Sequence, residues 1–244
     1  MRFALIGHPV KGSRSPRLFS AAYGGRYPYD LLGGDDFEAL WQRFLSDYQG
    51  INITAPYKQD AFGRVDVLSG NARESGAVNL AVKTPEGIAG YNTDVDGIVL
   101  SVQECGIPVQ RALVVGAGGA GRAAVVAALR LGCRQVTVVN RTLEKALALA
   151  AFAGGEGAGL EALPEAVREA DLVLYTIPGP VPELALSDFS GRILLEANYR
   201  TPCLSGLPGC TYLSGKKWLL YQAVAGYGLF TGEEPDTSAM LRVL

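Results

Sequence analysis

Apolar and polar residues follow one another along the chain in blocks that predict strands alternating with helices. From residue 37 onward, apolar residues recur at intervals of three and four (Phe37, Leu40, Trp41, Phe44 and Leu45), which predicts an amphipathic helix. A second helix is predicted to start near Pro16 and to stop at the following glycine pair. Short apolar runs typical of strands occupy residues 2–7, 29–32 and 50–54. Because such alternation builds mostly parallel sheets, the pattern predicts an α/β fold.

The segment 77–92 interrupts this alternation. Two short extended runs flank "TPEG", which is a hairpin-type connection. We therefore expect an antiparallel pair of strands in an otherwise parallel sheet. A helix is expected over residues 94–106, with its stop at Gly106, and "IPVQ" after it is typical of a linker.

A second series of strands and helices begins at Arg111. A strand, a glycine-rich turn and a helix ending near Gly132 come first. The helix predicted over residues 217–232 is long enough to pack back on the first half of the chain. Between them, strands are expected at 134–139, 171–177 and 191–199, and helices at 143–153 and 163–170. The whole pattern predicts two α/β domains.

The composition excludes several classes of function. The chain is 48% hydrophobic and 19% charged with a net charge of −2, and it has no Lys/Arg-rich run. Nucleic acid and membrane surfaces are therefore not expected as partners. No apolar run is long enough to span a bilayer, and we expect no signal peptide. The four cysteines form no C-x-x-C pair and His8 is the only histidine, so we expect reduced thiols, no metal site and a cytoplasmic protein.

The glycine-rich turn "VVGAGGAGRAA" has the spacing of a dinucleotide-binding motif. Gly116, Gly118 and Gly121 fit G-x-G-x-x-G, and they lie between a predicted strand and a predicted helix, the context that this motif requires. Gly116 allows the tight turn, and Gly118 lets the backbone approach a pyrophosphate at the helix N-terminus. The alternative is a tight turn without a ligand.

The residue about 20 positions beyond these glycines indicates which dinucleotide binds. An acidic residue there would hold the ribose of NAD, but this chain has Asn140, followed by Arg141 and Thr142. A guanidinium and a hydroxyl suit a 2′-phosphate, and Lys145 adds a positive charge close by. NADP(H) is therefore favoured over NAD(H). The other explanation of Arg141 is an exposed arginine at a helix start.

Polar residues gather at strand ends and turns of the first half. In open α/β sheets the loops at the carboxyl ends of strands converge, and hydroxyls and amides gathered there suit a polyhydroxylated ligand. Taken singly, each group is also explained by turn chemistry, such as a serine N-cap of the helix that follows Ser15. The groups are Ser13 with Ser15, Asn52 with Thr54 and Lys58, Asn79, and Asn92 with Thr93 and Asp94.

Lys58 and Asp94 are the residues of this set that suit acid–base chemistry. A lysine can give a proton to a developing alkoxide, and a neighbouring carboxylate can orient the ammonium. The presence of a single histidine argues against a histidine-based mechanism. The alternative for Lys58 is a solvated lysine at a helix start.

Several segments of the chain resemble, in their order, the motifs of the shikimate dehydrogenase family. They are "NITAPYK", "GAVN", "GYNTD", "GAGGAGRAA" and "NRT", and "SRSP" and "YQA" fit the family too. The resemblance covers essentially the whole chain. It implies NADPH-dependent reduction of 3-dehydroshikimate to shikimate, on the route to aromatic amino acids. It further implies a substrate domain with a mostly parallel mixed sheet, residues 1–100 plus 219–244, and a Rossmann-like NADP-binding domain, residues 101–218.

The resemblance also assigns roles to individual residues. Lys58 and Asp94 would be catalytic. The substrate would be bound by Ser13, Ser15, Asn52, Thr54, Asn79, Tyr199 and Gln222, with the two serines at its carboxylate. NADP(H) would be bound by Gly116, Ala117, Gly118, Gly119, Ala120, Asn140, Arg141, Thr142 and, near the nicotinamide, Gly215.

The sequence departs from the family pattern at several positions. Gly12 stands where histidine is usual, and Leu80 stands where threonine is usual. The segment after Tyr175 lacks the motif that is usual in the family, and "NYRTP" is shorter than the corresponding family motif. These departures bear on the cofactor loops and on the exact substrate. Two alternatives stay open, a quinate/shikimate-type dehydrogenase of broader specificity and a non-catalytic NADP(H)-binding redox sensor. A monomer and a homodimer are both compatible with the sequence.

Overall fold

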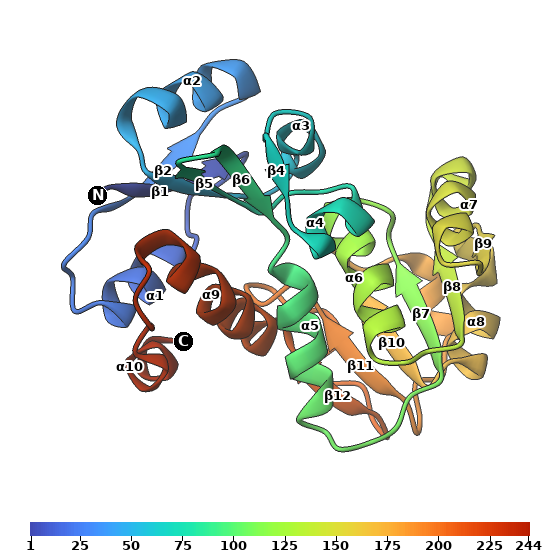
Figure 1. Ribbon diagram of the computed structural model, residues 1–244. Coiled ribbons are helices and arrows are strands. Elements are labelled where there is room, and N and C mark those ends of the chain that lie inside the picture. Colours follow the sequence, from blue (N-terminus) through green and yellow to red (C-terminus); the bar gives the residue numbers. More distant parts are fainter. The chain divides into compact units, whose positions relative to one another are not determined.

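The structure, a computed structural model, describes residues 1–244, which form two compact units. Unit 1 comprises Met1–Gly97 and Leu220–Leu244, and unit 2 comprises Ile98–Leu219. Each unit contains one six-stranded sheet (Figure 1). The domain limits predicted at residues 100 and 219 lie next to these breaks, and the assignment of substrate and cofactor to the units stays a prediction.

The sheet of unit 1 has the strand order β2-β1-β3-β5-β6-β4. Only β5 runs against its neighbours, since it pairs antiparallel with both β3 and β6, whereas the other pairs are parallel. The predicted antiparallel hairpin around "TPEG" is therefore confirmed. The strands are β1 (Phe3–Gly7), β2 (Tyr29–Gly33), β3 (Gly50–Ile53), β4 (Val67–Leu68), β5 (Leu80–Thr84) and β6 (Gly87–Tyr91).

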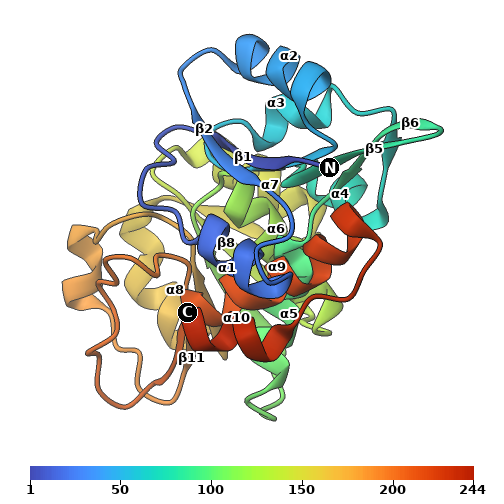
Figure 2. The same ribbon diagram turned by 90° about the vertical axis from the view of Figure 1, so that its left-hand side faces the viewer.

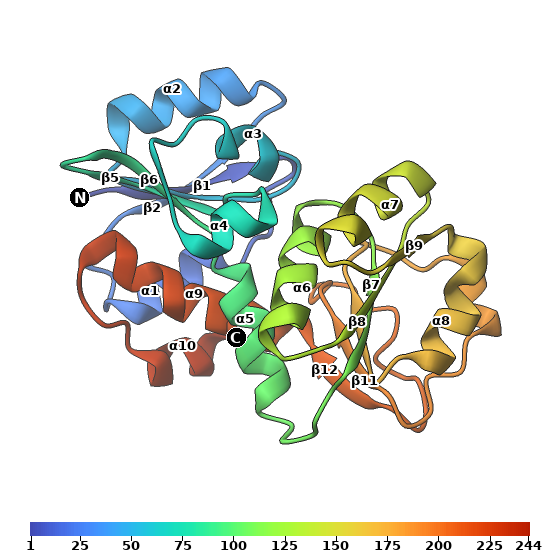
Figure 3. The same cartoon turned by 45° about the vertical axis from the view of Figure 1, so that its right-hand side comes forward.

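Helices cover both faces of this sheet. Figures 1 and 3 show α2 and α3 on one face, with α1, α9 and α10 on the other. Figure 2 shows the C-terminal helices beside α1, although they are far apart in the sequence, and α1 packs on α10. The helices are α1 (Ser15–Ala22), α2 (Phe37–Asp47), α3 (Lys58–Phe62), α4 (Gly70–Ser75), α5 (Asp94–Gln103), α9 (Gly215–Thr231) and α10 (Thr237–Val243). Helices α5 and α9 each extend into unit 2.

Successive side chains of β3 point to opposite faces of the sheet. Ile51 and Ile53 belong to the apolar core that contains Trp41 and Phe44 of α2. Asn52 between them points to the opposite face, because successive residues of a strand alternate. A polar residue in a buried strand is thus directed toward α1 and α9.

The sheet of unit 2 is wholly parallel, with the order β12-β11-β10-β7-β8-β9. In chain order this is 6-5-4-1-2-3, the arrangement of a dinucleotide-binding Rossmann fold. Helices α6 and α7 pack together on β7 and β8, and α8 lies on the other face (Figure 3). The elements are β7 (Arg111–Val115), α6 (Gly119–Arg130), β8 (Gln135–Val139), α7 (Leu143–Phe152), β9 (Glu156–Ala158), α8 (Leu163–Glu169), β10 (Leu172–Tyr175), β11 (Ile193–Glu196) and β12 (Thr211–Ser214).

The differences from the predicted elements concern short segments. The strands β4, β9 and β12 and the helices α3, α4 and α10 were not predicted. Each is two to seven residues long and shows neither a clear periodicity nor a sustained apolar run. The helix predicted over 94–106 ends at Gln103, and Gly106 adopts a left-handed φ of 64° beyond it. No helix combines the length and the apolar character needed to cross a bilayer.

Candidate active site

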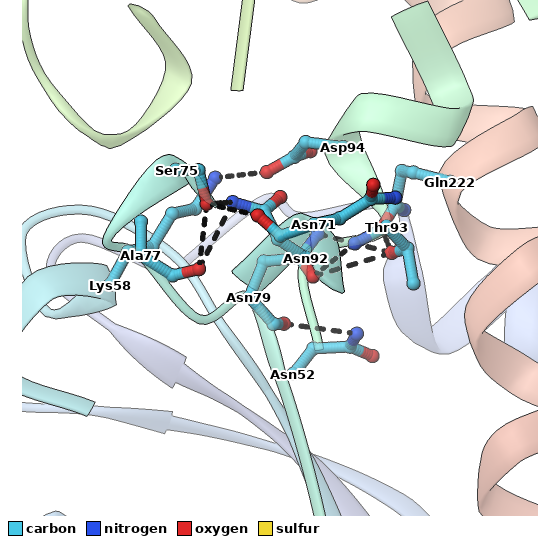
Figure 4. A network of polar contacts seen from close by, with 10 residues as sticks. All are labelled: Asn52, Lys58, Asn71, Ser75, Ala77, Asn79, Asn92, Thr93, Asp94 and Gln222. Atoms are coloured by element: carbon cyan, nitrogen blue, oxygen red, sulfur yellow. Dashed lines mark hydrogen bonds and ion pairs between the residues drawn. The ribbon is translucent and has the colours of Figure 1, made fainter. Parts of the chain in front are cut away.

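The side chains of Lys58 and Asp94 meet in unit 1. Lys58 is the first residue of α3, and Asp94 is the first residue of α5. The Lys58 Nζ donates a hydrogen bond of 2.6 Å to Asp94 Oδ2, and the two side chains are only 14% and 11% exposed (Figure 4). Because solvent screens a largely buried pair weakly, the carboxylate holds the ammonium in a defined position.

The turn after β3 brings Lys58 to the end of the sheet. The Thr54 N–H donates to the carbonyl of Ile6, which extends the pairing of β3 with β1 by one residue. The Tyr57 N–H then donates to the carbonyl of Thr54 and closes the turn that contains Pro56. The Thr54 methyl lies against Gly7, where an added Cβ would be 2.3 Å from it. Lys58 is therefore placed by backbone pairing at the carboxyl end of β3.

Asn79 and Thr93 form the centre of a buried polar network. Asn79 Oδ1 accepts from the Thr93 N–H at 2.8 Å, and Asn79 Nδ2 donates to Thr93 Oγ1 at 3.1 Å. The Thr93 hydroxyl donates in turn to Gln222 Oε1 at 3.3 Å. Figure 4 shows Thr93 between these two amides, beside the Lys58–Asp94 pair. Three distant segments of the chain thus meet next to the acid–base pair.

Tyr29 extends this network and was not predicted. Its hydroxyl donates to Asn52 Oδ1 at 2.7 Å, and Asn52 Nδ2 lies 3.4 Å from the carbonyl of Asn79. Burial raises the pKa of Tyr29 well above its usual value, nearby Tyr227 acts in the same sense, and a hydrogen bond with the Ser15 side chain opposes them. Tyr29 therefore remains a protonated donor and fixes which atom of the Asn52 amide faces it. Nothing in "YPYDLL" indicates this, because the contact depends on the register between strands.

Ser13 and Ser15 lie together at the start of α1. The Ser13 hydroxyl donates to Ser15 Oγ at 3.1 Å, and the Ser15 N–H donates to Ser13 Oγ at 3.2 Å. Ser15 is 7% exposed, and its carbonyl accepts from the Tyr227 hydroxyl of α9. The expected serine N-cap is wrong, since the helix begins at Ser15 and Arg14 takes the N-cap position without a side-chain hydrogen bond. The Ser15 side chain instead forms hydrogen bonds with the side chains of Ser13 and Tyr29.

Asn92, grouped with Thr93 and Asp94 in the sequence, has a different surrounding. Its Nδ2 donates to Ser75 Oγ at 2.8 Å and to the carbonyl of Ala77 at 3.1 Å. These contacts join the end of α4 to the loop before α5 (Figure 4). Asn92 therefore braces the backbone that carries Asp94.

The glycine-rich turn of unit 2 has the geometry that its spacing predicts. Gly116 has a φ of 109°, which favours glycine, and its N–H donates to the carbonyl of Val139. A Cβ added at Gly121 would lie 2.0 Å from the carbonyl oxygen of Gly116, so the helix approaches the turn too closely for any side chain. Gly118 is exposed with open space around it, and Gly119 and Ala120 begin α6. The free N–H groups of the first helical turn are thus accessible.

The residues after β8 divide into a structural group and a free group. Asn140 Oδ1 accepts from the Ala117 N–H at 3.2 Å, and its Nδ2 donates to the carbonyl of Thr142. Asn140 therefore joins the end of β8 to the glycine-rich turn. Arg141, Thr142 and Lys145 are exposed, and neither cation has an ion-pair partner in the structure. Two unpaired positive charges lie where an anion can approach.

The segment after β11 is organised by a carboxylate that the sequence did not reveal. Glu196 is fully buried, and it accepts from the N–H groups of Cys203 and Leu204 and from the Tyr212 hydroxyl at 2.7, 3.2 and 2.8 Å. Burial, followed by the hydrogen bond with Glu196, raises the pKa of Cys203 to about 11. The loop after β11 is therefore held at Cys203 and Leu204 by the Glu196 carboxylate, and the Cys203 thiol stays protonated.

Tyr199 and Gly215, two residues predicted to bind ligands, both belong to unit 2. Tyr199 is half-buried, with the Arg200 guanidinium 6.0 Å from its ring centre. Gly215 opens α9, where an added Cβ would lie 2.5 Å from the carbonyl oxygen of Ala197. Close backbone packing therefore accounts for glycine at this position.

No group of three or more histidine, cysteine, aspartate or glutamate side chains could hold a metal ion in this structure, and the four cysteines are unpaired. Unit 2 has the strand order and glycine-rich turn of a dinucleotide-binding fold, and unit 1 carries a buried lysine–carboxylate pair among amides and hydroxyls. Together these features are typical of nicotinamide-dependent dehydrogenases.

Two sequence profiles match the chain. "Shikimate dehydrogenase substrate binding domain" matches residues 5–81, and "Shikimate / quinate 5-dehydrogenase" matches residues 101–190. The chain belongs to the shikimate dehydrogenase family, which confirms the resemblance drawn from its motifs.

Similarity to individual proteins extends over nearly the whole chain. The chain is 34% identical to the shikimate dehydrogenase (NADP(+)) of Moorella thermoacetica, over 99% of this chain and 91% of that protein. It is 36% identical to the enzyme of the same name from Rubrobacter xylanophilus, over 98% and 94%. The crystal structure of shikimate 5-dehydrogenase from Thermus thermophilus in complex with NADP(H) and shikimate superposes with a TM-score of 0.83, at 32% identity, over the full length of both chains. The predicted fold class is confirmed.

Proposed function

We propose that the chain catalyses the reversible, NADPH-dependent reduction of 3-dehydroshikimate to shikimate. The relatives named above carry this activity in their names, and one solved relative holds both NADP(H) and shikimate. The observation that carries the proposal is the buried contact of Lys58 with Asp94 beside the amides of unit 1. A chain that only sensed NADP(H) would have no need of a desolvated acid–base pair.

The acid–base step is assigned to the pair. Bound NADPH supplies the hydride. As negative charge develops on the ketone oxygen of the substrate, the Lys58 ammonium donates a proton to it. Asp94 holds the ammonium in line through the 2.6 Å hydrogen bond, which reduces the reorganisation needed at the moment of transfer. In the reverse direction the same pair removes the proton from the alcohol.

Substrate binding is assigned to the hydroxyls and amides of unit 1. Ser13 and Ser15 would bind the carboxylate, and Asn52, Asn79 and Gln222 would bind ring hydroxyls. Since Asn52 Oδ1 already accepts from Tyr29, Asn52 can offer an N–H to the ligand. Thr54 and Tyr199 are included on the family resemblance alone. The proposal further includes a cytoplasmic location, no nucleic-acid or membrane partner, and a monomer or homodimer.

Cofactor binding is assigned to the glycine-rich turn and the segment after β8. Gly118 is exposed, and the half-buried Gly119 and Ala120 begin the first turn of α6, so this backbone is proposed to bind a pyrophosphate. Gly116 and Ala117 are buried and are included because they shape the turn. The unpaired Arg141 and Lys145, with Thr142, fit a 2′-phosphate, and Asn140 leaves no carboxylate to repel it. Gly215 stays a prediction for the nicotinamide end.

Ser15→Ala is expected to raise the KM for shikimate and to leave kcat less changed, because the lost hydrogen bond serves ground state and transition state alike. A hydrogen bond to a charged group contributes about 1.5–3 kcal/mol, so the KM should rise by about tenfold to a hundredfold. Steady-state kinetics would measure this, with Ser46→Ala on the exposed side of α2 as the control. A shikimate-soaked crystal with the carboxylate away from both serines would overturn the assignment.

The function itself is tested with purified protein, 3-dehydroshikimate and NADPH, by following the loss of NADPH absorbance in the near ultraviolet. Turnover with NADPH and little with NADH is the expected result. Comparable oxidation of quinate would show the broader specificity of a quinate/shikimate enzyme. Binding of NADPH without turnover of either compound would favour the redox sensor instead.

A further inference from the structure

Helix α9 approaches the sheet of unit 1 most closely at Gly226. A Cβ added there would lie 2.7 Å from Leu80 Cδ1, closer than real side chains come to one another. It would also lie 3.4 and 3.5 Å from the Oγ1 and Cγ2 of Thr93. Leu80, at the start of β5, is fully buried and has little room to move away. The helix backbone therefore rests directly on Leu80 and Thr93.

Two contacts of the proposed site come from the same stretch of α9. Gln222 lies one helical turn before Gly226, so both face the sheet, and Gln222 Oε1 accepts from Thr93 Oγ1 (Figure 4). Tyr227, the next residue, donates from its hydroxyl to the carbonyl of Ser15 at 3.3 Å. The distance between α9 and β5 at Gly226 thus sets the reach of both side chains.

Leu80 reaches α9 through its Cδ1, the atom that an added Cβ at position 226 would meet. A helix residue with a Cβ at position 226 would have to retreat from it, while glycine allows full contact. We propose that Leu80 and Gly226 form a matched pair of positioning residues, which seats α9 so that Gln222 and Thr93 are held for the substrate. This inference rests on the proposed function.

The test compares two glycines of one helix. In Gly226→Ala the added methyl meets Leu80, α9 shifts, and the KM for shikimate should rise about threefold to tenfold, the range for one hydrogen bond between neutral groups. The KM for NADP should stay unchanged. Gly228→Ala is the matched control, because it has the same gain in helix propensity and its Cβ would meet only the carbonyl of Glu233, at 3.6 Å. Its kinetics should equal those of the wild type.

The second variant removes the partner. Leu80→Val lacks the Cδ1 atom that the new methyl would meet, so Leu80→Val/Gly226→Ala should recover a shikimate KM near that of Leu80→Val alone. The melting temperatures should show the same coupling. Gly226→Ala should melt at a lower temperature than Gly228→Ala, and adding Leu80→Val should reduce the loss caused by Gly226→Ala. If Gly226→Ala does not fold, folding of the double variant supports the pair.

A Gly226→Ala enzyme with wild-type KM and melting temperature would overturn the inference, and so would a double variant that only adds the two defects. Failure of the wild type to turn over shikimate is a separate result. It would refute the proposed function, whereas the melting temperatures would still report on the matched pair.

Discussion

Lys58→Met is expected to lower kcat by about 10²–10⁴-fold, the usual contribution of general acid–base catalysis. Methionine keeps an unbranched stem but cannot donate the proton. The Lys58 side chain is 14% exposed, and its Nζ lies 2.6 Å from Asp94 Oδ2. The shikimate affinity should change far less, since the serines and amides that bind it remain. Stopped-flow or steady-state kinetics in both directions, with shikimate binding measured separately, would check this.

Asp94→Asn should reduce kcat by a similar order, because an amide no longer orients the ammonium by charge. The double variant should be little worse than either single variant, since residues that act as a unit are non-additive. Lys83→Met is a suitable control, because Lys83 lies in the same unit and its Nζ donates to the carbonyl of Leu45 away from the pair. A Lys58→Met enzyme with near-normal kcat would falsify the mechanism.

Arg141→Ala is expected to weaken the binding of NADPH by about tenfold to a hundredfold, because a hydrogen bond to a charged group contributes about 1.5–3 kcal/mol. NADH lacks the 2′-phosphate, so its affinity should hardly change. The guanidinium is exposed and unpaired in the structure, and therefore no internal ion pair is lost with it. The measurement is the ratio of the two KM values, or of the two dissociation constants from fluorescence titration.

Arg134→Ala supplies the matched control for this experiment. Arg134 is an exposed arginine of the same unit, at the amino end of β8, whereas Arg141 follows the carboxyl end of that strand. It should leave both cofactors unaffected. If Arg141→Ala weakens the binding of NADPH and of NADH equally, Arg141 does not recognise the 2′-phosphate.

The local patterns of the sequence were sufficient for the larger elements. The spacing from Phe37 onward predicted α2, and the runs from Arg111 predicted the first strand and helix of the Rossmann fold. "TPEG" predicted the hairpin of β5 and β6. These predictions succeeded because helix and strand periodicities and turn residues are properties of a few consecutive positions. The two-residue strand β4 was not predicted, because it is defined by its pairing with β6. The five-residue helix α3 was not predicted, because a single turn is too short to show a periodicity.

What the sequence alone determined is the set of residues available for the chemistry and the places where glycine permits a tight turn. The glycines at 116, 118 and 121 indicated such a turn between a strand and a helix, and the structure then showed the positive φ of Gly116 and the lack of space at Gly121. The tertiary structure decided which side chains touch. Lys58 and Asp94 are 36 residues apart in the chain, and Thr93 and Gln222 are 129 apart. Such contacts depend on strand register and on how a helix seats against a sheet, and no local pattern encodes them. For the same reason the Tyr29 hydroxyl, the buried Glu196 carboxylate and the contact of Gly226 with Leu80 became visible only in the folded chain.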